Sequence, residues 1–542
     1  MASSCRASRR LAPRGRQDLS CEPAHRARSG PGNDVKSVGA SPYRGRVTTQ
    51  TSPTPATPTP SGDDGGGLDR GVLLVAGVVV LGAIMSILDI TVVSVAQPTF
   101  QRDFDATPAE TAWTMTGYTL ALATVIPLSG WAADRFGTKR LYMMAVLLFT
   151  AGSVLCAAAN SIEMLTAFRV LQGLGGGMLM PVGMTIMTRA AGPDRVGRVM
   201  AVLGVPMLLG PIFGPILGGW LIDVASWHWI FLINLPIGLG ALMYAARVLP
   251  KDDVAPSESF DFLGMLLLSP GLALFLFGVS SIPEEGTVAS ARVLVSAAIG
   301  LALVGLFVFR FFARSLEHPL LDLRLFGNPR LTVAVVAMSL FAIAFFGASL
   351  LFPQYFLLIR GEDTLKAGLL LAPQGVGAML TMPVAGMLTD KIGPGKIVLG
   401  GIGLIVLGMA GFTQVAPDTS YLFLLGSLFV MGLGMGGTMM PIMTSALQTL
   451  RDHEIARGST LMNITQQVAA SIGTALFSVL LTNGFKDVEA STPQGQLGGM
   501  SDAFASCFVV GTVLVAVCLV PAWFLPRRKA TRELDPAAVM GH

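Results

Sequence analysis

The chain has 542 residues, of which 52% are hydrophobic and only 13% are charged, whereas soluble globular domains carry roughly 25% charged residues. Together with a mean hydropathy of +0.64, this composition excludes an ordinary array of soluble domains and indicates a membrane protein. The net charge of +4 is small for the length and lies in short loops, so nucleic acid is not expected as a partner.

Residues 1–69 form a polar N-terminal segment rich in Arg, Ser and Pro. Its alternating Pro and Thr residues, from Pro53 to Pro60, favour extended backbone that buries little surface, so a disordered cytoplasmic tail is expected. The segment has no apolar core of the kind that a secretory signal peptide needs. An organelle transit peptide is the alternative interpretation.

From Gly71 to Leu525, long apolar runs follow one another with short polar gaps. A helix needs about 20 apolar residues to cross the ~30 Å hydrocarbon core, and helices satisfy their own backbone hydrogen bonds there. The expected fold is therefore an all-α polytopic membrane protein. Fourteen transmembrane helices are predicted, near 71–96, 111–131, 141–160, 163–188, 197–222, 229–248, 262–281, 291–313, 331–358, 367–388, 396–415, 421–448, 459–482 and 504–525.

The basic residues predict the orientation of these helices. If the N-terminus is cytoplasmic, nearly all Lys and Arg residues outside the spans fall on the cytoplasmic side, as positively charged loops do. The outer loops then hold only Arg102, Arg292, Arg360, Lys366 and Lys486. This sorting requires an even number of spans and predicts that the C-terminal tail, 527–542, is also cytoplasmic.

Two parts of the sequence repeat one another. Residues 130–137 and 386–393 share the pattern Gly-x-x-x-Asp-basic-x-Gly at an offset of 256, and the glycine-rich run 173–177 is echoed at 432–436. We therefore predict two related six-helix bundles, at 70–250 and 330–526, with two inserted transmembrane helices within 251–329. Rocking of two such halves about a midplane site is how repeat-built transporters alternate access.

Further motifs occur in a fixed order along the chain. They are the segment 88–98 with Asp89, Thr91 and Pro98; the loop 130–140; the run 169–173; the Gly-Pro-rich run 210–219; and the segment 227–236. Together they resemble the major facilitator superfamily, specifically its fourteen-helix drug:proton antiporter branch, the multidrug and quaternary-ammonium efflux pumps. Ser94, Gln97 and His228 depart from the family pattern, which usually has Asn, Leu and Arg there.

The resemblance implies a proton-coupled antiporter that exports small hydrophobic or amphipathic compounds by alternating access, as a multidrug pump. A dedicated exporter of one metabolite, lipid or siderophore is the alternative. The resemblance further implies a monomer in the cell membrane. Its partners would be small molecules, protons and the lipid bilayer, and it would be driven by the proton gradient without a cofactor. An integral-membrane enzyme is the alternative from another class, but the sequence shows no catalytic nucleophile and no metal-ligand spacing.

Asp89 and Arg169 are ionisable residues deep within predicted spans, where charge is costly and usually functional. They lie at matching depth, because the first span runs outward and the fourth runs inward. We expect Asp89 to carry the proton. Arg169 would keep the Asp89 carboxylate ionised until the two side chains separate. The alternative is a static buried ion pair that fixes two helices in register.

Two further groups of residues are expected to serve the conformational change. A cytoplasmic gate would contact the other bundle through charges in a tight turn, with a weaker counterpart at Asp390; the alternative is loop charge that only fixes topology. Its residues are Gly130, Asp134, Arg135, Gly137, Lys139, Arg140 and Asp390. A flexible seam in the fifth span would come from residues that lack bulk or backbone donors, namely Gly210, Pro211, Gly214, Pro215, Gly218 and Gly219.

Polar residues within apolar spans predict a substrate cavity, because polar groups in lipid must point inward. Interhelical hydrogen bonding without substrate is an equally good interpretation. Recurring methionines in the fourth and twelfth spans could add flexible, polarizable walls, although packing is the commoner role. The candidate cavity residues are Thr91, Gln354, Tyr355, Gln374, Asn463, Gln466 and Gln467.

Overall fold

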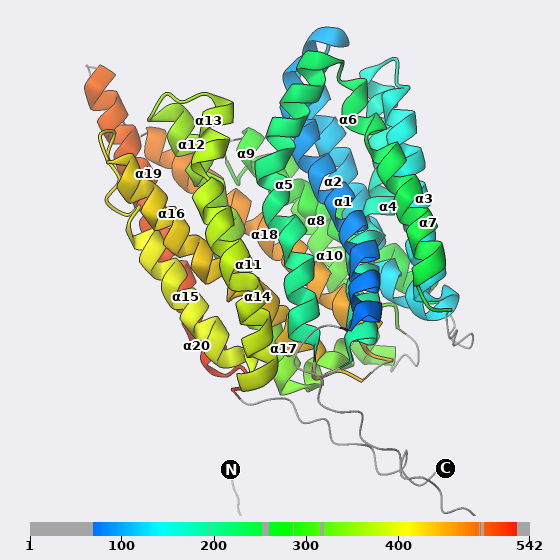
Figure 1. Cartoon of the computed structure of the whole chain (residues 1–542). Coiled ribbons are helices and arrows are strands. Elements are labelled where there is room, and N and C mark those ends of the chain that lie inside the picture. The colour runs from blue at the N-terminus through cyan, green and yellow to red at the C-terminus, as the bar shows by residue number, and fades with distance from the viewer. Residues whose placement is uncertain are drawn as a thin grey trace, which may run out of the picture. The chain divides into compact units, whose positions relative to one another are not determined.

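A computed structural model describes residues 69–192, 195–251, 260–285, 287–314, 319–451, 453–486, 488 and 493–527. The described residues form helices joined by short connections, with no strand among them (Figure 1). The predicted disorder of residues 1–68 and most of the predicted C-terminal tail lie outside the described residues. The all-α expectation is confirmed.

The helices of the first half and of the inserted region follow the predicted runs closely. They are α1 Arg70–Asp103, α2 Pro108–Phe136, α3 Thr138–Ala157, α4 Ile162–Ala191, α5 Val196–Val224, α6 His228–Leu232, α7 Asn234–Val248, α8 Phe262–Ser280, α9 Ile282–Glu285 and α10 Ala291–Arg314.

The second half begins with a 3-10 turn, η1, at Leu323–Gly327. Several of its predicted spans are divided into two helical segments, as at Gly437 between α16 and α17. Its helices are α11 Pro329–Ser349, α12 Leu351–Leu358, α13 Thr364–Leu370, α14 Ala372–Ile392, α15 Pro394–Ala410, α16 Tyr421–Gly436, α17 Met439–Leu447, α18 Ile455–Lys486, α19 Pro493–Val517 and α20 Leu519–Trp523.

Within the described part of the chain, eleven helical segments are long and apolar enough to cross a membrane, and α15 is a shorter apolar helix. Helices α2 and α5 occupy the two remaining predicted runs. The count of fourteen spans stays a prediction, as do the exact domain boundaries. The fold itself, two helical bundles plus an inserted pair, is as expected.

The first helix is longer than predicted. It continues from the expected end at residue 96 to Asp103, with Pro98 inside it. The added turn carries Phe100, whose buried ring packs edge-on against Trp227 at 5.4 Å. This aromatic contact stabilises the part of the helix that lies beyond the apolar run.

Helix α2 also begins earlier than predicted, because it has a capping box. The Thr107 hydroxyl accepts from the Glu110 N–H at 3.3 Å, and the Thr107 N–H donates to the Glu110 carboxylate at 2.8 Å. Pro108 occupies the first turn. The hydrogen bonds from the backbone and hydroxyl of Thr107 hold the pKa of Glu110 below its usual range, so the N-terminal end of α2 carries a negative charge.

The internal repeat is present in the packing as well as in the sequence. In the first half, α4 approaches α2 so closely that a Cβ on Gly173 would lie 2.5 Å from the Tyr118 carbonyl oxygen. In the second half, α16 approaches α14 in the same way, with Gly432 against the Gln374 carbonyl. Tyr118 and Gln374 are themselves separated by the offset of 256. The two bundles therefore use the same glycine contact.

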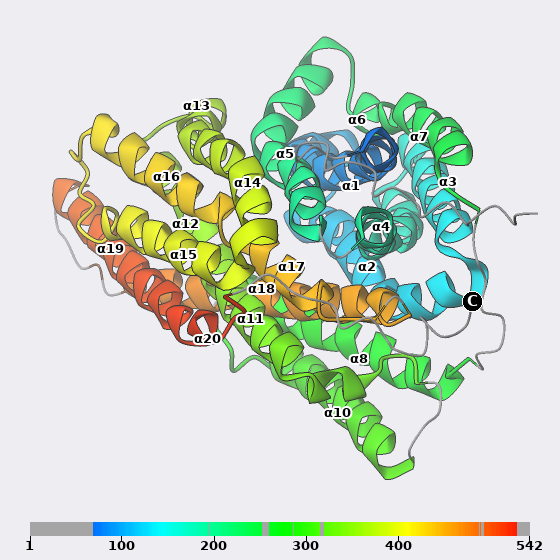
Figure 2. The same cartoon turned by 60° about the horizontal axis from the view of Figure 1, so that its bottom comes forward.

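The inserted helices α8 and α10 pack against each other, and α8 also contacts α2 of the first bundle and α18 of the second (Figure 2). Just before α8 begins, Asp261 binds Arg310 of α10 through two contacts of 2.8 and 3.0 Å. Asp261 also caps α8 by accepting from the Gly264 N–H at 2.8 Å. The inserted pair thus contacts both bundles.

Two glycines of α16 test the close contact. Replacing Gly432 with Ala should destabilise the protein by about 1–3 kcal/mol, because the new methyl group meets the Gln374 backbone. Gly426→Ala is the matched control, since a Cβ there meets nothing within 4 Å. The melting temperature of the detergent-purified protein should fall for Gly432→Ala and should stay level or rise for Gly426→Ala. Equal melting temperatures would contradict the proposed packing.

Candidate functional site

Asp89 of α1 and Arg169 of α4 form a buried ion pair. The Arg169 Nη1 group donates to Asp89 Oδ2 at 2.5 Å, and the two side chains are 0–1% exposed. Arg169 Nε also donates to the Thr114 carbonyl of α2 at 3.1 Å. The contact that the sequence predicted at matching depth is therefore present, and it lies inside the first bundle.

Gln172, one turn after Arg169, completes this arrangement. Its Oε1 accepts from Arg169 Nη1 at 2.6 Å, and its Nε2 donates to Asp89 Oδ1 at 2.8 Å and to Ser153 Oγ of α3 at 2.7 Å. Gln172 was not among the predicted site residues. The available signal was its position three residues after Arg169, on the same face of an otherwise apolar helix.

Aromatic rings cover the guanidinium group. The Arg169 Cζ atom lies 4.1 Å from the centre of the Tyr118 ring and 5.9 Å from that of Phe231, distances at which a ring face attracts a cation. The Tyr118 hydroxyl is in turn 3.3 Å from Ser86 Oγ. Helices α1 to α4 all contribute to the site, so a change in the charge of Asp89 alters contacts among four helices.

The glycines of α5 form a smooth face against α1. A Cβ on Gly218 would lie 3.1 Å from Val92, and Cβ atoms on Gly210 and Gly214 would overlap Ile87 and Thr91. Gly219 points elsewhere, with nothing within 4 Å of its added Cβ. The side chains of Pro211 and Pro215 lie outside the described residues.

Thr91 belongs to this helix contact. Its Oγ1 lies 3.0–3.2 Å from two carbonyls of its own helix and 3.2 Å from the Gly210 carbonyl, so these acceptors share its one hydroxyl proton. The structure thus places this candidate cavity residue between α1 and α5, where it links the two helices.

Asp134, near the C-terminal end of α2, contacts both bundles. Its carboxylate lies 3.4 Å from Arg189 of α4 and 3.7 Å from Arg457 of α18. Two glycines allow this approach: Gly137 turns the chain with φ of +89°, and a Cβ on Gly130 would lie 2.9 Å from Thr460 Oγ1. The predicted contact between this turn and the other bundle is therefore seen.

Asp390 makes closer contacts than a weaker counterpart would. It is 5% exposed and accepts from the backbone N–H groups of Gly197 and Arg198 at 2.9 and 3.2 Å. The Arg198 Nε atom is 3.6 Å away. These N–H groups belong to the first turn of α5, where no partners exist within the helix, so a carboxylate is favoured there.

The remaining basic residues of the predicted gate differ in their contacts. Lys139 Nζ donates to the carbonyls of Ala246 and Leu249 at 2.8 and 2.7 Å. Lys139 therefore binds the C-terminal end of α7 in its own bundle, where cations are favoured. Arg135 is partly buried and Arg140 is exposed.

The candidate cavity residues of the second bundle do not converge on one site. Tyr355 is fully buried, and its hydroxyl donates to the Ala416 carbonyl at 2.8 Å. Asn463 Nδ2 donates to the Ser459 carbonyl at 2.8 Å, and Gln374 Nε2 lies 3.1 Å from the sulfur of Met435. Gln354 and Gln466 are partly buried. Three of these side chains thus bind other parts of the protein, and the other two are partly buried.

Gln467 lines a cavity of about 240 Å³ where three helices meet. Thr119 of α2, Ser280 of α8 and Thr474 of α18 line it as well. The cavity has hydroxyl and amide groups but no charged side chain in its lining, so it suits a neutral or weakly polar group.

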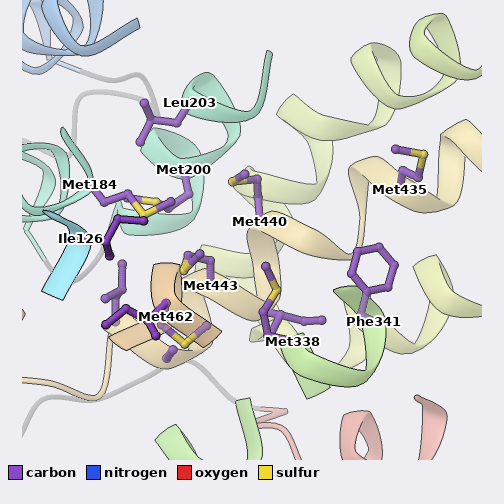
Figure 3. Packing of buried hydrophobic residues seen from close by; sticks show 14 of the residues in the cluster. Ile126, Met184, Met200, Leu203, Met338, Phe341, Met435, Met440, Met443 and Met462 are labelled. Carbon is purple, nitrogen blue, oxygen red and sulfur yellow. The ribbon is translucent and has the colours of Figure 1, made fainter. Parts of the chain in front are cut away.

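Methionines fill the contact between the bundles (Figure 3). Met184 and Met200 come from the first bundle, and Met440, Met443 and Met462 from the second; all five are at most 2% exposed. The Asn463 amide lies 3.3 Å from the Met184 sulfur. Unbranched thioether side chains adapt to altered neighbours, so this contact can be remade at low cost.

Comparisons with known proteins agree with the motifs. The family model described as Major Facilitator Superfamily matches residues 79–474. The Multidrug resistance protein B homolog of Mycobacterium tuberculosis strain H37Rv is 52% identical over 501 residues, covering 86% of this chain and 93% of that protein. The Multidrug export protein EmrB of Haemophilus influenzae is 30% identical over 407 residues, covering 74% and 79%.

Solved structures share the fold. The human organic anion transporter MFSD10 has a TM-score of 0.57 at 16% identity, with 83% of this chain and 100% of that chain covered. The proton:xylose symporter XylE has a TM-score of 0.53 at 15% identity, with 83% and 96% covered. From the matching family model, the similar relatives and the shared fold, it follows that this chain is a multi-pass membrane protein belonging to the major facilitator superfamily, in the drug-efflux branch that its motifs resemble.

Proposed function

We propose that the protein is a proton-coupled multidrug exporter, an antiporter that expels small hydrophobic or amphipathic compounds in exchange for protons. The names of the relatives, which include a multidrug resistance protein and a multidrug export protein, support the substrate class. The observation that carries the coupling is the buried contact of Asp89 with Arg169 and Gln172. A single carboxylate at this depth favours neutral or singly charged substrates.

The proton step uses both oxygens of Asp89. While Arg169 and Gln172 donate to them, the carboxylate stays charged, because its charge is matched and each oxygen has a donor. If Arg169 moves away, an unmatched carboxylate in an apolar interior is unfavourable, and proton uptake removes the charge. Protonation and separation of the pair therefore favour each other, which is what exchange of substrate for proton requires.

Alternating access uses the contacts between the bundles at the cytoplasmic end. In the closed arrangement, Asp134 faces Arg457 and Asp390 caps α5. Hydroxyl contacts lie beside them, with Ser129 Oγ at 3.1 Å from Thr460 Oγ1 and Thr185 Oγ1 at 2.8 Å from Ser459 Oγ. We infer that these contacts hold the outward-facing state and that they break together when the site opens to the cytoplasm.

The proposed setting is the cell membrane, with both termini cytoplasmic and the protein acting as a monomer without a cofactor. Exposed apolar side chains such as Phe309 and Phe312, at 70% and 71%, support a lipid-facing surface for the inserted helices. The excess of Lys and Arg in alternate loops supports the orientation.

Asp89→Asn tests the coupling. The variant should fold but lose proton movement, because Asn keeps the shape and cannot exchange a proton at neutral pH. Purified protein is reconstituted in liposomes that contain a trapped pH-sensitive dye, ethidium is added as the probe compound, and internal pH is recorded. Wild-type protein should move protons in response to ethidium, and Asp89→Asn should not.

The control is Asp105→Asn, in an exposed outer loop with positive φ that Asn also adopts; it should behave as wild type. Ethidium-dependent proton movement by Asp89→Asn would show that the pair only fixes helix register. If wild-type protein moves protons with one cell metabolite and none of a panel of drugs, a dedicated exporter is indicated instead.

Stability measurements separate the structural part of the ion pair from its function. Arg169→Met alone leaves a buried carboxylate without its cation and should destabilise the protein by roughly 3–5 kcal/mol. The double variant Asp89→Leu/Arg169→Met removes both charges and should regain most of that loss in a thermal melt, while transport stays absent. A double variant as unstable as the single one would contradict this assignment of the energy.

A further inference from the structure

The inserted helices are fastened to α2 at both ends. Near the outer end, Trp113 of α2 stacks on Phe277 of α8, with ring centroids 5.6 Å apart and planes 25° from parallel. Near the cytoplasmic end, Trp131 of α2 lies 4.4 Å from Phe260, just before α8 begins. Aromatic pairs contribute beyond their buried area, so α8 is expected to move with the first bundle.

The contacts of the inserted helices with α18 are made by smaller groups. Ser280 Oγ of α8 lies 3.4 Å from Ser471 Oγ of α18. Val279, Ile282 and Val293 cluster with Ala475. Short side chains form a surface that can slide, so relative motion of α18 past α8 costs less than motion of α2 past α8.

The connection that follows the inserted helices reaches the gate. Asp322 caps η1 through Oδ1, which accepts from the Arg324 N–H at 3.0 Å. Its Oδ2 lies 3.8 Å from Arg457 Nη1, while Asp134 Oδ2 lies 3.7 Å from Arg457 Nε. Arg457 of the second bundle therefore contacts two carboxylates, one at the end of α2 and one after the inserted helices.

The same connection is anchored to the start of α8. The Leu320 N–H donates to Asp261 Oδ2 at 3.4 Å, and Asp261 is held by Arg310. The Asp322 side chain is 18% exposed and that of Arg457 is 14% exposed. A pair shielded to this degree attracts more strongly than a fully solvated one.

We propose that Asp322 is a positioning residue of the cytoplasmic gate, through which the inserted helices stabilise the outward-facing state. It contacts Arg457 at Nη1, whereas Asp134 contacts it at Nε, so α18 must leave two carboxylates before the cytoplasmic side can open. This proposal builds on the alternating-access part of the proposed function. It does not depend on proton coupling or on the substrate.

A buried cysteine can report the opening of the gate. Ser459 is 0% exposed and contacts Thr185 of the other bundle, so Ser459→Cys becomes reactive only when the bundles separate. The parent protein for this assay carries Cys5→Ser and Cys21→Ser, which removes the two cysteines of the N-terminal segment. The other three cysteines, Cys156, Cys507 and Cys518, are kept because they are buried. The rate of labelling by a membrane-impermeant maleimide is measured in inside-out vesicles without substrate or pH gradient.

Asp322→Asn should raise this rate about threefold, because Asn keeps the cap on η1 and removes only the charge. Asp322→Glu should restore slow labelling. The matched control is Asp363→Asn, which should leave the rate unchanged. Asp363 caps α13 at the outer side by accepting from the Lys366 N–H. Thr460→Cys, buried beside Ser459, serves as a second reporter if Ser459→Cys folds poorly.

An unchanged rate for Asp322→Asn, or an equal increase for Asp363→Asn, would overturn the proposal. Because the assay needs neither protons nor a transported compound, failure of proton coupling at Asp89 would not alter its outcome. Fast labelling already present in the parent protein would instead contradict the closed cytoplasmic arrangement on which both proposals rest.

Discussion

A charge in an apolar interior has to be matched, and this constraint organises the first bundle. Asp89 has a cation on one oxygen and an amide on the other, and Arg169 is further held by a backbone carbonyl and an aromatic ring. Removing one member of such a set typically costs about 3–5 kcal/mol. Four helices are therefore bound into one unit. Between the bundles, the ion pairs of Asp390 with Arg198 and of Asp134 with Arg457 are longer, at 3.6 and 3.7 Å, and shorter hydrogen bonds lie beside them, such as the 2.9 Å bond from the Gly197 N–H to Asp390. Charge pairing is therefore closer at Asp89 within the first bundle than in these two pairs between the bundles.

The two halves carry related turns, and the aspartates of these turns bind different partners in the opposite bundle. Gly137 and Gly393 make the same turn, with φ of +89° and +90°. The aspartates that precede them diverge: Asp134 faces the Arg457 side chain, whereas Asp390 binds backbone N–H groups of α5. This backbone contact still requires a small residue at the helix end, because a Cβ on Gly197 would lie 2.7 Å from Asp390 Oδ1. The first contact thus depends on a charged side chain, and the second on the absence of one.

The sequence predicted the helices, the repeat and the Asp89–Arg169 contact, because each depends on local composition or on the expense of buried charge. It did not predict that Gln172 would bind both charges, since a lone Gln in an apolar helix has many available partners. It also understated Asp390, whose partners are backbone groups that carry no sequence signal. Tyr355 was assigned to a cavity from its polarity alone, yet its hydroxyl binds a loop carbonyl. Such pairings depend on how helices distant in the chain are rotated, which periodicity does not fix.

Helices α1 and α5 touch where Thr91 fills the space left by the missing side chain of Gly214. The two positions share one fixed volume, because both backbones are held in place by neighbouring contacts such as the Thr91 hydrogen bond to Gly210. A methyl group gained at position 214 has to be offset by atoms lost at position 91. In evolution the two sites are therefore not free to drift independently, and their side-chain sizes should covary inversely among homologous transporters.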